Sequence, residues 1–392
     1  MPLDRNEHGK NALPARMREF FSPSGNLGRF HGFEFRPGQM RMSERVAEAI
    51  AKKGHLVVEA GTGTGKSLAY LVPSIFAAEE LGKKAILSTY TIHLQEQLLG
   101  KDIPMARSLV PFEFSAALLK GRQNYLCPHR LKKALLHQGD LFAAGQAEQL
   151  RGLVDWARRT ADGTLSDLDF QVDGPVWAQV CSEAYACNPR HCGGPNPCFY
   201  QKARARVLEA QVVILNHALL FGLLAGMEEG EESPSEGYLF PNDFLVLDEA
   251  HEVEDVAAKA LGLEIRLGSL RFLLQRLVHP RTKKGVLTRV GDGNAVKAAL
   301  GILGMLEGEF EAILASAGIE TPGQKRVRQP LRVDCELGPR LMDVRSQLLK
   351  LAEDAGDGED RGELRDHARR LEGMACGLGE FLKMSREGHA YW

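Results

Sequence analysis

The chain has 392 residues, of which 44% are hydrophobic and 26% are charged, and its formal net charge is −2. This length allows roughly two or three domains with cores of their own, and the composition is that of an ordinary globular protein. The charge excludes a protein that binds nucleic acid through overall basicity, so any such binding must use local patches. No signal-peptide core and no apolar run of about 20 residues is visible, so we expect a cytoplasmic protein.

Short apolar runs alternate with helical patterns in two blocks of the chain, residues 1–111 and 207–258. Nearly continuous apolar runs are typical of strands that are covered on both faces. The predicted strands are residues 55–60, 84–89, 212–216 and 244–250. The alternation of such strands with helices predicts an α/β fold around a parallel sheet.

A glycine-rich loop follows the first predicted strand and precedes an apolar-periodic helix. It reads Ala60, Gly61, Thr62, Gly63, Thr64, Gly65, Lys66, Ser67. In such a loop backbone N–H groups surround phosphates, the lysine reaches them, and the hydroxyl of the last residue ligates Mg²⁺. Ala60 stands where the general pattern has glycine. The loop therefore predicts a site for ATP and Mg²⁺.

Two acidic residues, Asp248 and Glu249, end the predicted strand 244–250. Ligands of open α/β sheets bind at the carboxyl ends of the strands. We therefore expect Asp248 to hold Mg²⁺ through water and Glu249 to orient and deprotonate an attacking water. His251 is expected to couple this site to a neighbouring domain. The alternative, two acids that only cap a helix, is disfavoured by the phosphate loop upstream.

The region between the two blocks, residues 112–206, carries five of the seven cysteines and little strand signal. We interpret it as an insertion into the nucleotide-binding core. Disulfides are the weakest explanation for a cytoplasmic protein. Four thiolates can hold a zinc ion or an iron–sulfur cluster, and five cysteines exceed either need. Cys181, Cys187, Cys192 and Cys198 would form a self-contained zinc site without Cys127.

The C-terminal part, residues 259–392, is leucine-rich and helical in pattern. Apolar residues recur there at spacings of three and four, which predicts buried stripes of a small helical bundle. Three such stripes run from Val296 to Ile313, from Leu341 to Ala352 and from Leu364 to Leu382. We expect Cys335 and Cys376 to be buried among them without a functional role.

Six segments in the same order resemble the superfamily 2 DNA helicases with an iron–sulfur domain. They are FEFRPGQ, AGTGTGKS, STYTIHLQEQLL, KGRQNYLC, VVILNHALL and LDEAH. The resemblance covers residues 14–258 and is strongest to the DinG-type branch, which is related to the xeroderma pigmentosum group D helicase. It implies a RecA-like P-loop fold and an ATP-dependent helicase that moves 5′→3′ on single-stranded or forked DNA in repair or replication.

The resemblance also assigns roles to individual residues. It implies that Arg36 and Gln39 recognise adenine and that Thr91 and Gln95 contact single-stranded DNA. Its [4Fe–4S] ligands match Cys127, Cys187, Cys192 and Cys198, which leaves Cys181 without a role. The basic segments 128–133 and 201–206 suit tracking the backbone of a DNA strand, and Tyr125 and Phe199 nearby suit the stacking of its bases.

The implied organisation has four segments. Residues 1–111 and 207–258 form the RecA-like ATP-binding domain, 112–206 the iron–sulfur insertion, and 259–392 an arch-like helical domain. No motif of a second RecA-like domain follows; a truncated or split gene product and a half-protein that assembles with a partner chain are open explanations. We expect the chain alone to bind ATP weakly with little DNA-stimulated hydrolysis. The alternatives are a non-motor nucleic-acid-binding or regulatory module with a zinc site, and an RNA-directed ATPase.

Overall fold

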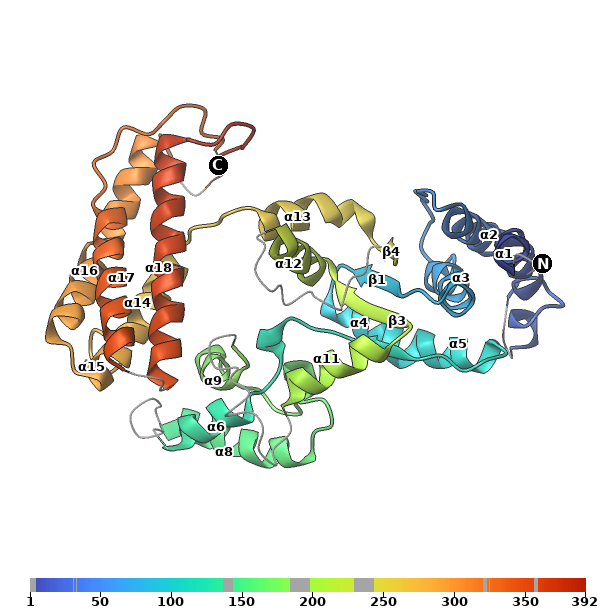
Figure 1. Ribbon diagram of the computed structural model, residues 1–392, viewed down its shortest axis with the longest axis horizontal. Helices are drawn as coiled ribbons and strands as arrows, with labels where there is room; N and C mark the ends of the chain where they lie inside the picture. The colour runs from blue at the N-terminus through green and yellow to red at the C-terminus, as the bar shows by residue number, and fades with distance from the viewer. Residues whose placement is uncertain are drawn as a thin grey trace. The chain divides into compact units, whose positions relative to one another are not determined.

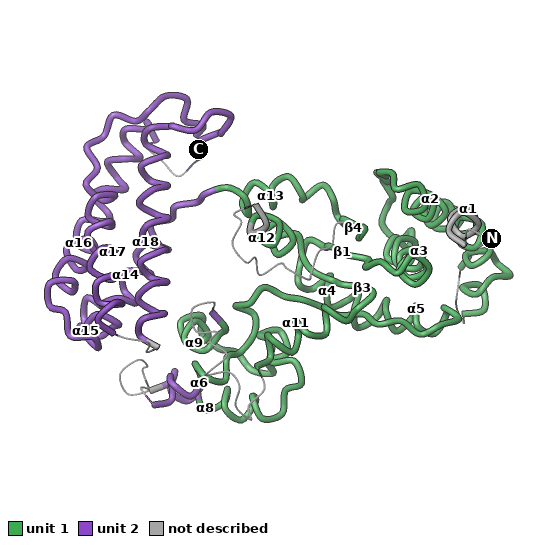
Figure 2. Tube along the Cα trace, viewed as in Figure 1, with its two compact units in different colours: residues 1–131, 151–182, 195–262 green, residues 132–150, 183–194, 263–392 purple. Residues whose placement is uncertain are grey.

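The computed structural model describes residues 5–30, 32, 34–136, 144–183, 198–228, 243–319, 323, 325–355 and 359–392. Contacts divide the chain into two units, shown in Figure 2. Unit 1 comprises residues 1–131, 151–182 and 195–262, and unit 2 comprises residues 132–150, 183–194 and 263–392. Among the described residues, no helix is both long and apolar enough to cross a membrane. The segment boundaries expected at 111, 206 and 258 remain predictions.

A parallel sheet with the strand order β2-β3-β1-β4 lies at the centre of unit 1 (Figure 1). Its strands are β1 (Ala85–Thr89), β2 (Ala116–Leu118), β3 (Val212–Asn216) and β4 (Phe244–Leu247). In the register, Ala85 pairs with Val212 on one side and with Phe244 on the other. Three of the four predicted strands are thus confirmed, and the α/β class with them.

The fourth predicted strand, residues 55–60, is wrong. This segment belongs to no strand of the described sheet, and Val57 is 96% exposed. β4 is an edge strand of the described sheet, and Leu245 in it is 44% exposed. An apolar run predicts a strand only where a neighbour pairs with it, and the described residues provide none here. Conversely, the short strand β2 forms where the sequence carries little strand signal.

The helices of unit 1 surround α3 and the sheet. Eleven consecutive residues of α3, from Leu68 to Ala78, are buried, because α3 contacts α1, α2 and α5 as well as strands β1 and β3. The helices before β2 are α1 (Arg5–Phe20), η1 (Leu27–Arg29), α2 (Pro37–Lys52), α3 (Lys66–Leu81), α4 (Ile92–Gln97), the π-helix η2 (Leu98–Asp102) and α5 (Ile103–Leu109). After β4 follow η6 (Ala250–Glu252) and α13 (Val253–Leu261).

The predicted insertion is mainly helical. Its elements, with the helix that follows β3, are η3 (Arg122–Asn124), α6 (Pro128–Leu136), α8 (Ala144–Arg159), η4 (Leu165–Asp167), α9 (Gly174–Val180), α11 (Phe199–Glu209) and α12 (His217–Glu228). Two isolated antiparallel bridges join its segments, Tyr125 with Thr164 and Leu126 with Cys181. Helix α11 packs against β2, so this part is attached to the edge of the sheet.

The C-terminal helices of unit 2 confirm the predicted bundle. They are α14 (Leu267–Leu277), α15 (Val286–Val290), α16 (Gly293–Ser316), α17 (Leu337–Asp354) and α18 (Glu359–Lys383). The apolar stripes of α16, α17 and α18 contribute to one core. The burial expected for two cysteines is wrong, because Cys335 is only half-buried and Cys376 is exposed. Cys376 follows the buried Ala375, and the next position of a helix lies about 100° further round its axis.

Candidate functional site

The phosphate loop ends at the first residue of α3. Gly63 and Gly65 have φ angles of 78° and 80°, in the left-handed region that glycine adopts without strain. At Gly65 a side chain would also collide with the amide of Gln39. Lys66 is the first residue of α3, so the positive end of the helix dipole lies at the loop. The loop therefore has the backbone conformation and field of an anion site.

The two acidic residues after β4 lie beside this loop. The Lys66 ammonium is 3.3 Å from Oε1 of Glu249. The Tyr70 hydroxyl donates a hydrogen bond of 3.1 Å to Oδ2 of Asp248. Burial raises the pKa of Asp248, as does the neighbouring charge of Glu249, whereas the Tyr70 hydroxyl lowers it. The fold thus brings together the two halves of the predicted nucleotide site.

Glu249 and His251 occupy more open positions. Glu249 has a φ of 54°, so the chain turns sharply directly after the strand. Its Oε2 lies 3.5 Å from Nδ1 of His251, whose side chain is 70% exposed. Nε2 of His251 is 3.6 Å from Glu252. An exposed His251 beside the acidic pair is compatible with the expected coupling role, which stays a prediction.

The residues expected to recognise adenine, Arg36 and Gln39, contact the phosphate loop. The Gln39 amide donates a hydrogen bond of 3.0 Å to the Gly65 carbonyl, and Arg36 donates one to the Gly63 carbonyl. Gln39 is buried, whereas Arg36 is exposed and pairs with Glu34 at 3.3 Å. Both side chains therefore brace the loop in this state, and their role toward adenine stays a prediction.

His217 is a functional candidate that the sequence reasoning missed. It is fully buried and lies between two strand ends, with Nδ1 2.7 Å from the Ser88 hydroxyl and Nε2 2.9 Å from the Asp248 carbonyl. Because a carbonyl oxygen only accepts, Nε2 carries the proton and Nδ1 accepts from Ser88. Burial lowers the pKa of His217, which keeps the ring neutral. The only signal was its place after the strand in VVILNHALL.

The segment expected to contact DNA divides between surface and core. Thr91 is exposed and caps α4, its hydroxyl accepting from the Leu94 amide at 3.2 Å. Gln95 is fully buried, and neither polar atom of its side chain has a hydrogen-bond partner among the described residues. Of the two predicted contacts, only Thr91 presents its side chain at the surface.

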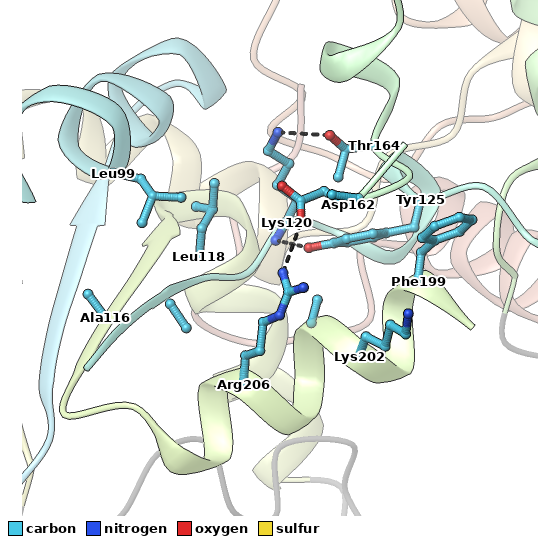
Figure 3. A pocket seen from close by; sticks show the side chains of 13 residues that line it. Leu99, Ala116, Leu118, Lys120, Tyr125, Asp162, Thr164, Phe199, Lys202 and Arg206 are labelled. Carbon is cyan, nitrogen blue, oxygen red and sulfur yellow. Dashed lines mark hydrogen bonds and ion pairs between the residues drawn. The ribbon is translucent and has the colours of Figure 1, made fainter. Parts of the chain in front are cut away.

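A buried lysine ties α4 to the cysteine-rich part. The Lys120 ammonium is 2.6 Å from Oε1 of Glu96, and it donates further hydrogen bonds to the hydroxyls of Thr164 and Ser166. Its backbone N–H donates to the Tyr125 hydroxyl at 3.0 Å. Figure 3 shows Lys120, Thr164 and Tyr125 at the lining of a small pocket, together with the ion pair of Arg206 and Asp162. The two atoms of that ion pair are 2.8 Å apart.

The expected stacking of bases on Tyr125 and Phe199 is wrong, because both rings are buried. The Tyr125 ring packs against Tyr200 with a centroid distance of 5.6 Å. Phe199 packs against Gly163, leaving no space there for a side chain. These aromatic residues belong to a local core, so they are not available to DNA.

Three cysteines of the predicted insertion, Cys127, Cys181 and Cys198, lie within the described residues. Cys127 precedes α6 and is buried, and its amide donates to the Val180 carbonyl at 2.8 Å. Cys181 is also buried, with the Arg130 guanidinium 3.6 Å from its sulfur. Cys198 is half-buried at the start of α11. The other two predicted ligands, Cys187 and Cys192, lie outside the described residues.

The groups expected to hold a metal or cluster can be compared with these positions. Ser67 and Asp248 provide the hydroxyl and carboxylate oxygens that Mg²⁺ prefers. Cys127 and Cys198 provide thiols, the donors that iron–sulfur clusters require. No group of three or more His, Cys, Asp or Glu side chains that could hold a metal occurs within the described ranges. The oxygen donors of Ser67 and Asp248 suit Mg²⁺, and the thiols of Cys127 and Cys198 suit an iron–sulfur cluster.

Comparison with known proteins shows which proteins this chain resembles in sequence. A scan against protein-family models finds no match. The ATP-dependent DNA helicase YoaA of Haemophilus influenzae is 36% identical over 384 residues, which cover 96% of this chain and 57% of that protein. YoaA of Escherichia coli is 37% identical over 249 residues, which cover 63% of the chain and 38% of that protein.

The ATP-dependent helicase DinG of Mycobacterium tuberculosis is 35% identical over 267 residues, which cover 63% of the chain and 39% of that protein. The chain therefore spans 57% of the length of the Haemophilus influenzae relative, and 38% and 39% of the other two. The similarity agrees with the phosphate loop and the adjoining acidic pair of an α/β domain. By its sequence, the chain is related to the ATP-dependent helicases named YoaA and DinG.

Proposed function

We propose that this chain is the ATP-binding part of an ATP-dependent DNA helicase. The observation that carries the proposal is the contact between the phosphate loop and the strand end, in which Lys66 lies 3.3 Å from Glu249 and Tyr70 holds Asp248. The two residues of each pair are far apart in sequence. Their meeting at the carboxyl edge of a parallel sheet supports a site for a nucleoside triphosphate.

The Lys66–Glu249 pair suggests how the site responds to ATP. The two side chains are each about one-third exposed, so the pair is weak and easily exchanged. When ATP binds, Lys66 moves to the phosphates, since they carry more negative charge than one carboxylate. Glu249 is then released to orient the attacking water and take its proton.

Mg²⁺ would be held by the Ser67 hydroxyl and, through water, by Asp248. When bound, it neutralises charge on the phosphates. The chain's own contribution is to fix these oxygens: Ser67 by the first turn of α3 and Asp248 by the hydrogen bond from Tyr70. The raised pKa of Asp248, caused mainly by burial, indicates a carboxylate that gains from a nearby cation.

The finer parts of the proposal concern the cluster and the DNA. We propose that Cys127, Cys187, Cys192 and Cys198 hold a structural [4Fe–4S] cluster and that single-stranded or forked DNA passes the exposed Thr91. Translocation 5′→3′, a role in repair or replication, and a partner that supplies a second RecA-like domain belong to the same proposal. Its support is the resemblance of the motifs and the similarity to proteins named DinG and YoaA.

Nucleotide binding tests the core of this proposal. Lys66→Ala should weaken binding of a fluorescent ATP analogue with Mg²⁺ by about tenfold or more, since it removes a charge-assisted contact of roughly 1.5–3 kcal/mol. Lys83→Ala, which removes a lysine just after the end of the same helix, is the matched control and should bind as the unaltered chain does. Equal affinities of all three proteins would contradict the proposed site.

A further inference from the structure

One buried carboxylate beside the nucleotide site has no part in the mechanism described so far. Asp102 is the last residue of the π-helix η2 and is 7% exposed. Its Oδ2 atom has no hydrogen-bond partner within the described part of the chain. η2 packs against α3, whose first turn carries Ser67. Single-turn π-helical segments often occur at functional sites, so this carboxylate needs a physical explanation.

The neighbours of Asp102 belong to the nucleotide site. Burial raises the pKa of Asp102; Lys101 lowers it, Asp248 raises it and the Ser67 hydroxyl lowers it. Asp102 also contributes to the raised pKa of Tyr70, which is dominated by burial and by Asp248. The packing of η2 against α3 and the Tyr70–Asp248 hydrogen bond of 3.1 Å agree with this, and place Asp102 in the same region as Ser67, Tyr70 and Asp248.

This arrangement is unfavourable without a cation. A buried carboxylate oxygen without a hydrogen-bond partner is destabilising, and two neighbouring carboxylates repel each other. Mg²⁺ keeps several of its waters and is commonly held through one or two carboxylates together with phosphates. Such a water shell supplies donors, which are what Oδ2 of Asp102 lacks.

We propose that Asp102 is a positioning residue for the Mg²⁺ of the nucleotide site, whose bound water would donate hydrogen bonds to its carboxylate. Asp248 and Asp102 would both hold the cation through its bound water, while the Ser67 hydroxyl would bind it directly. The inference rests on the proposed function, because it assumes that the loop binds a nucleotide with its metal. It adds a residue from η2 to a site otherwise built by the loop and β4.

The test measures metal binding rather than turnover. A fluorescent, non-hydrolysable ATP analogue is bound first in EDTA, and Mg²⁺ is then titrated in to find the midpoint of the fluorescence change. Asp102→Asn should raise this midpoint about tenfold, the usual effect of losing an outer-shell partner of a metal. Glu113→Gln removes one exposed carboxylate shortly after α5 and should shift the midpoint less than twofold.

Three outcomes separate the possibilities. A midpoint for Asp102→Asn equal to that of the unaltered chain overturns the inference. No analogue binding by the unaltered chain, with or without Mg²⁺, would instead show that the proposed function fails. If Asp102→Asn loses binding in EDTA because it does not fold, Asp102→Ser, which is smaller and neutral, takes its place and must give the same tenfold shift.

Discussion

At the scale of single residues, His217 connects the strands below the nucleotide site. Its ring joins the Ser88 hydroxyl of β1 to the Asp248 carbonyl after β4. Since the residue is fully buried, neither ring nitrogen can exchange this partner for water. The ring therefore fixes the position of the Asp248 backbone relative to β1. Replacing His217 should lower the free energy of unfolding by an amount that depends on pH.

The pH dependence follows from the lowered pKa of His217. Burial is the main cause, opposed by Asp248 and Glu252, and the ordinary value is 6.5. Below pH 6.5 the unfolded chain binds a proton that the folded chain resists, so this group contributes stability above pH 6.5 and loses it as the pH falls. The contribution lost by pH 5.5 is at most about 1.4 kcal/mol, one pH interval below the ordinary pKa.

His217→Phe should therefore destabilise the protein by about 1–3 kcal/mol at pH 7.5, because Ser88 and the Asp248 carbonyl lose a buried partner. The difference from the unaltered chain should narrow at pH 5.5, where the histidine no longer contributes fully. Urea unfolding at the two pH values measures both effects. His389→Phe alters an exposed histidine and should show no such narrowing. A constant difference at both pH values would contradict a buried neutral ring.

At the scale of elements, Lys120 joins α4 of the sheet domain to the loop that carries Thr164 and Ser166. The pair with Glu96 is 2.6 Å long, with Lys120 5% and Glu96 38% exposed. The pKa of Glu96 is lowered: burial acts against this, but hydrogen bonds from Lys120 and Ser166 outweigh it. This charged contact therefore links α4 to the cysteine-rich part.

A double-mutant cycle with Lys120→Met and Glu96→Gln measures the strength of this contact. We expect a coupling of about 1–2 kcal/mol in urea unfolding, below the 3–5 kcal/mol typical of breaking a fully buried pair because Glu96 is partly exposed. The nearby Arg206–Asp162 pair, whose side chains are 59% and 55% exposed, is the matched control and should couple by less than about 1 kcal/mol. Equal coupling energies in the two cycles would show that the Lys120–Glu96 pair links α4 to the cysteine-rich part no more strongly than an exposed ion pair does.

The elements also show where sequence reasoning succeeds. The strands 84–89 and 212–216 and the three stripes of the helical bundle were predicted correctly, since each is apolar for the length of an element and is covered by neighbours. Residues 55–60 carry the same signal but lack a paired strand, which no local pattern reveals. β2 has only three residues and is held by its pairing with β3, so its local signal is weak.

At the scale of the whole molecule, the main residues of the proposed nucleotide site could be predicted from the sequence, whereas the neighbouring side chains that hold them in place could not. Lys66, Asp248 and Glu249 follow from a motif in which each residue type has a chemical reason. Tyr70 and Asp102 depend on which helices pack together, which the sequence does not state. Gln95 shows the reverse error, because a motif position predicted to reach DNA is turned into the core.

The five clustered cysteines bear on the identity of the whole molecule, because a cluster and a zinc site need different sets of them. Arg130 donates to the Cys181 and Ala178 carbonyls and lies 3.6 Å from the Cys181 sulfur, so Cys181 has a structural partner on α6. Protein prepared without oxygen should contain about four irons and four sulfides per chain. Cys127→Ser should lose them, whereas Cys181→Ser should keep them with at most a modest loss of stability. One zinc per chain that survives Cys127→Ser but not Cys181→Ser would reverse this assignment, and with it the proposal that this part of the molecule is a helicase's iron–sulfur domain.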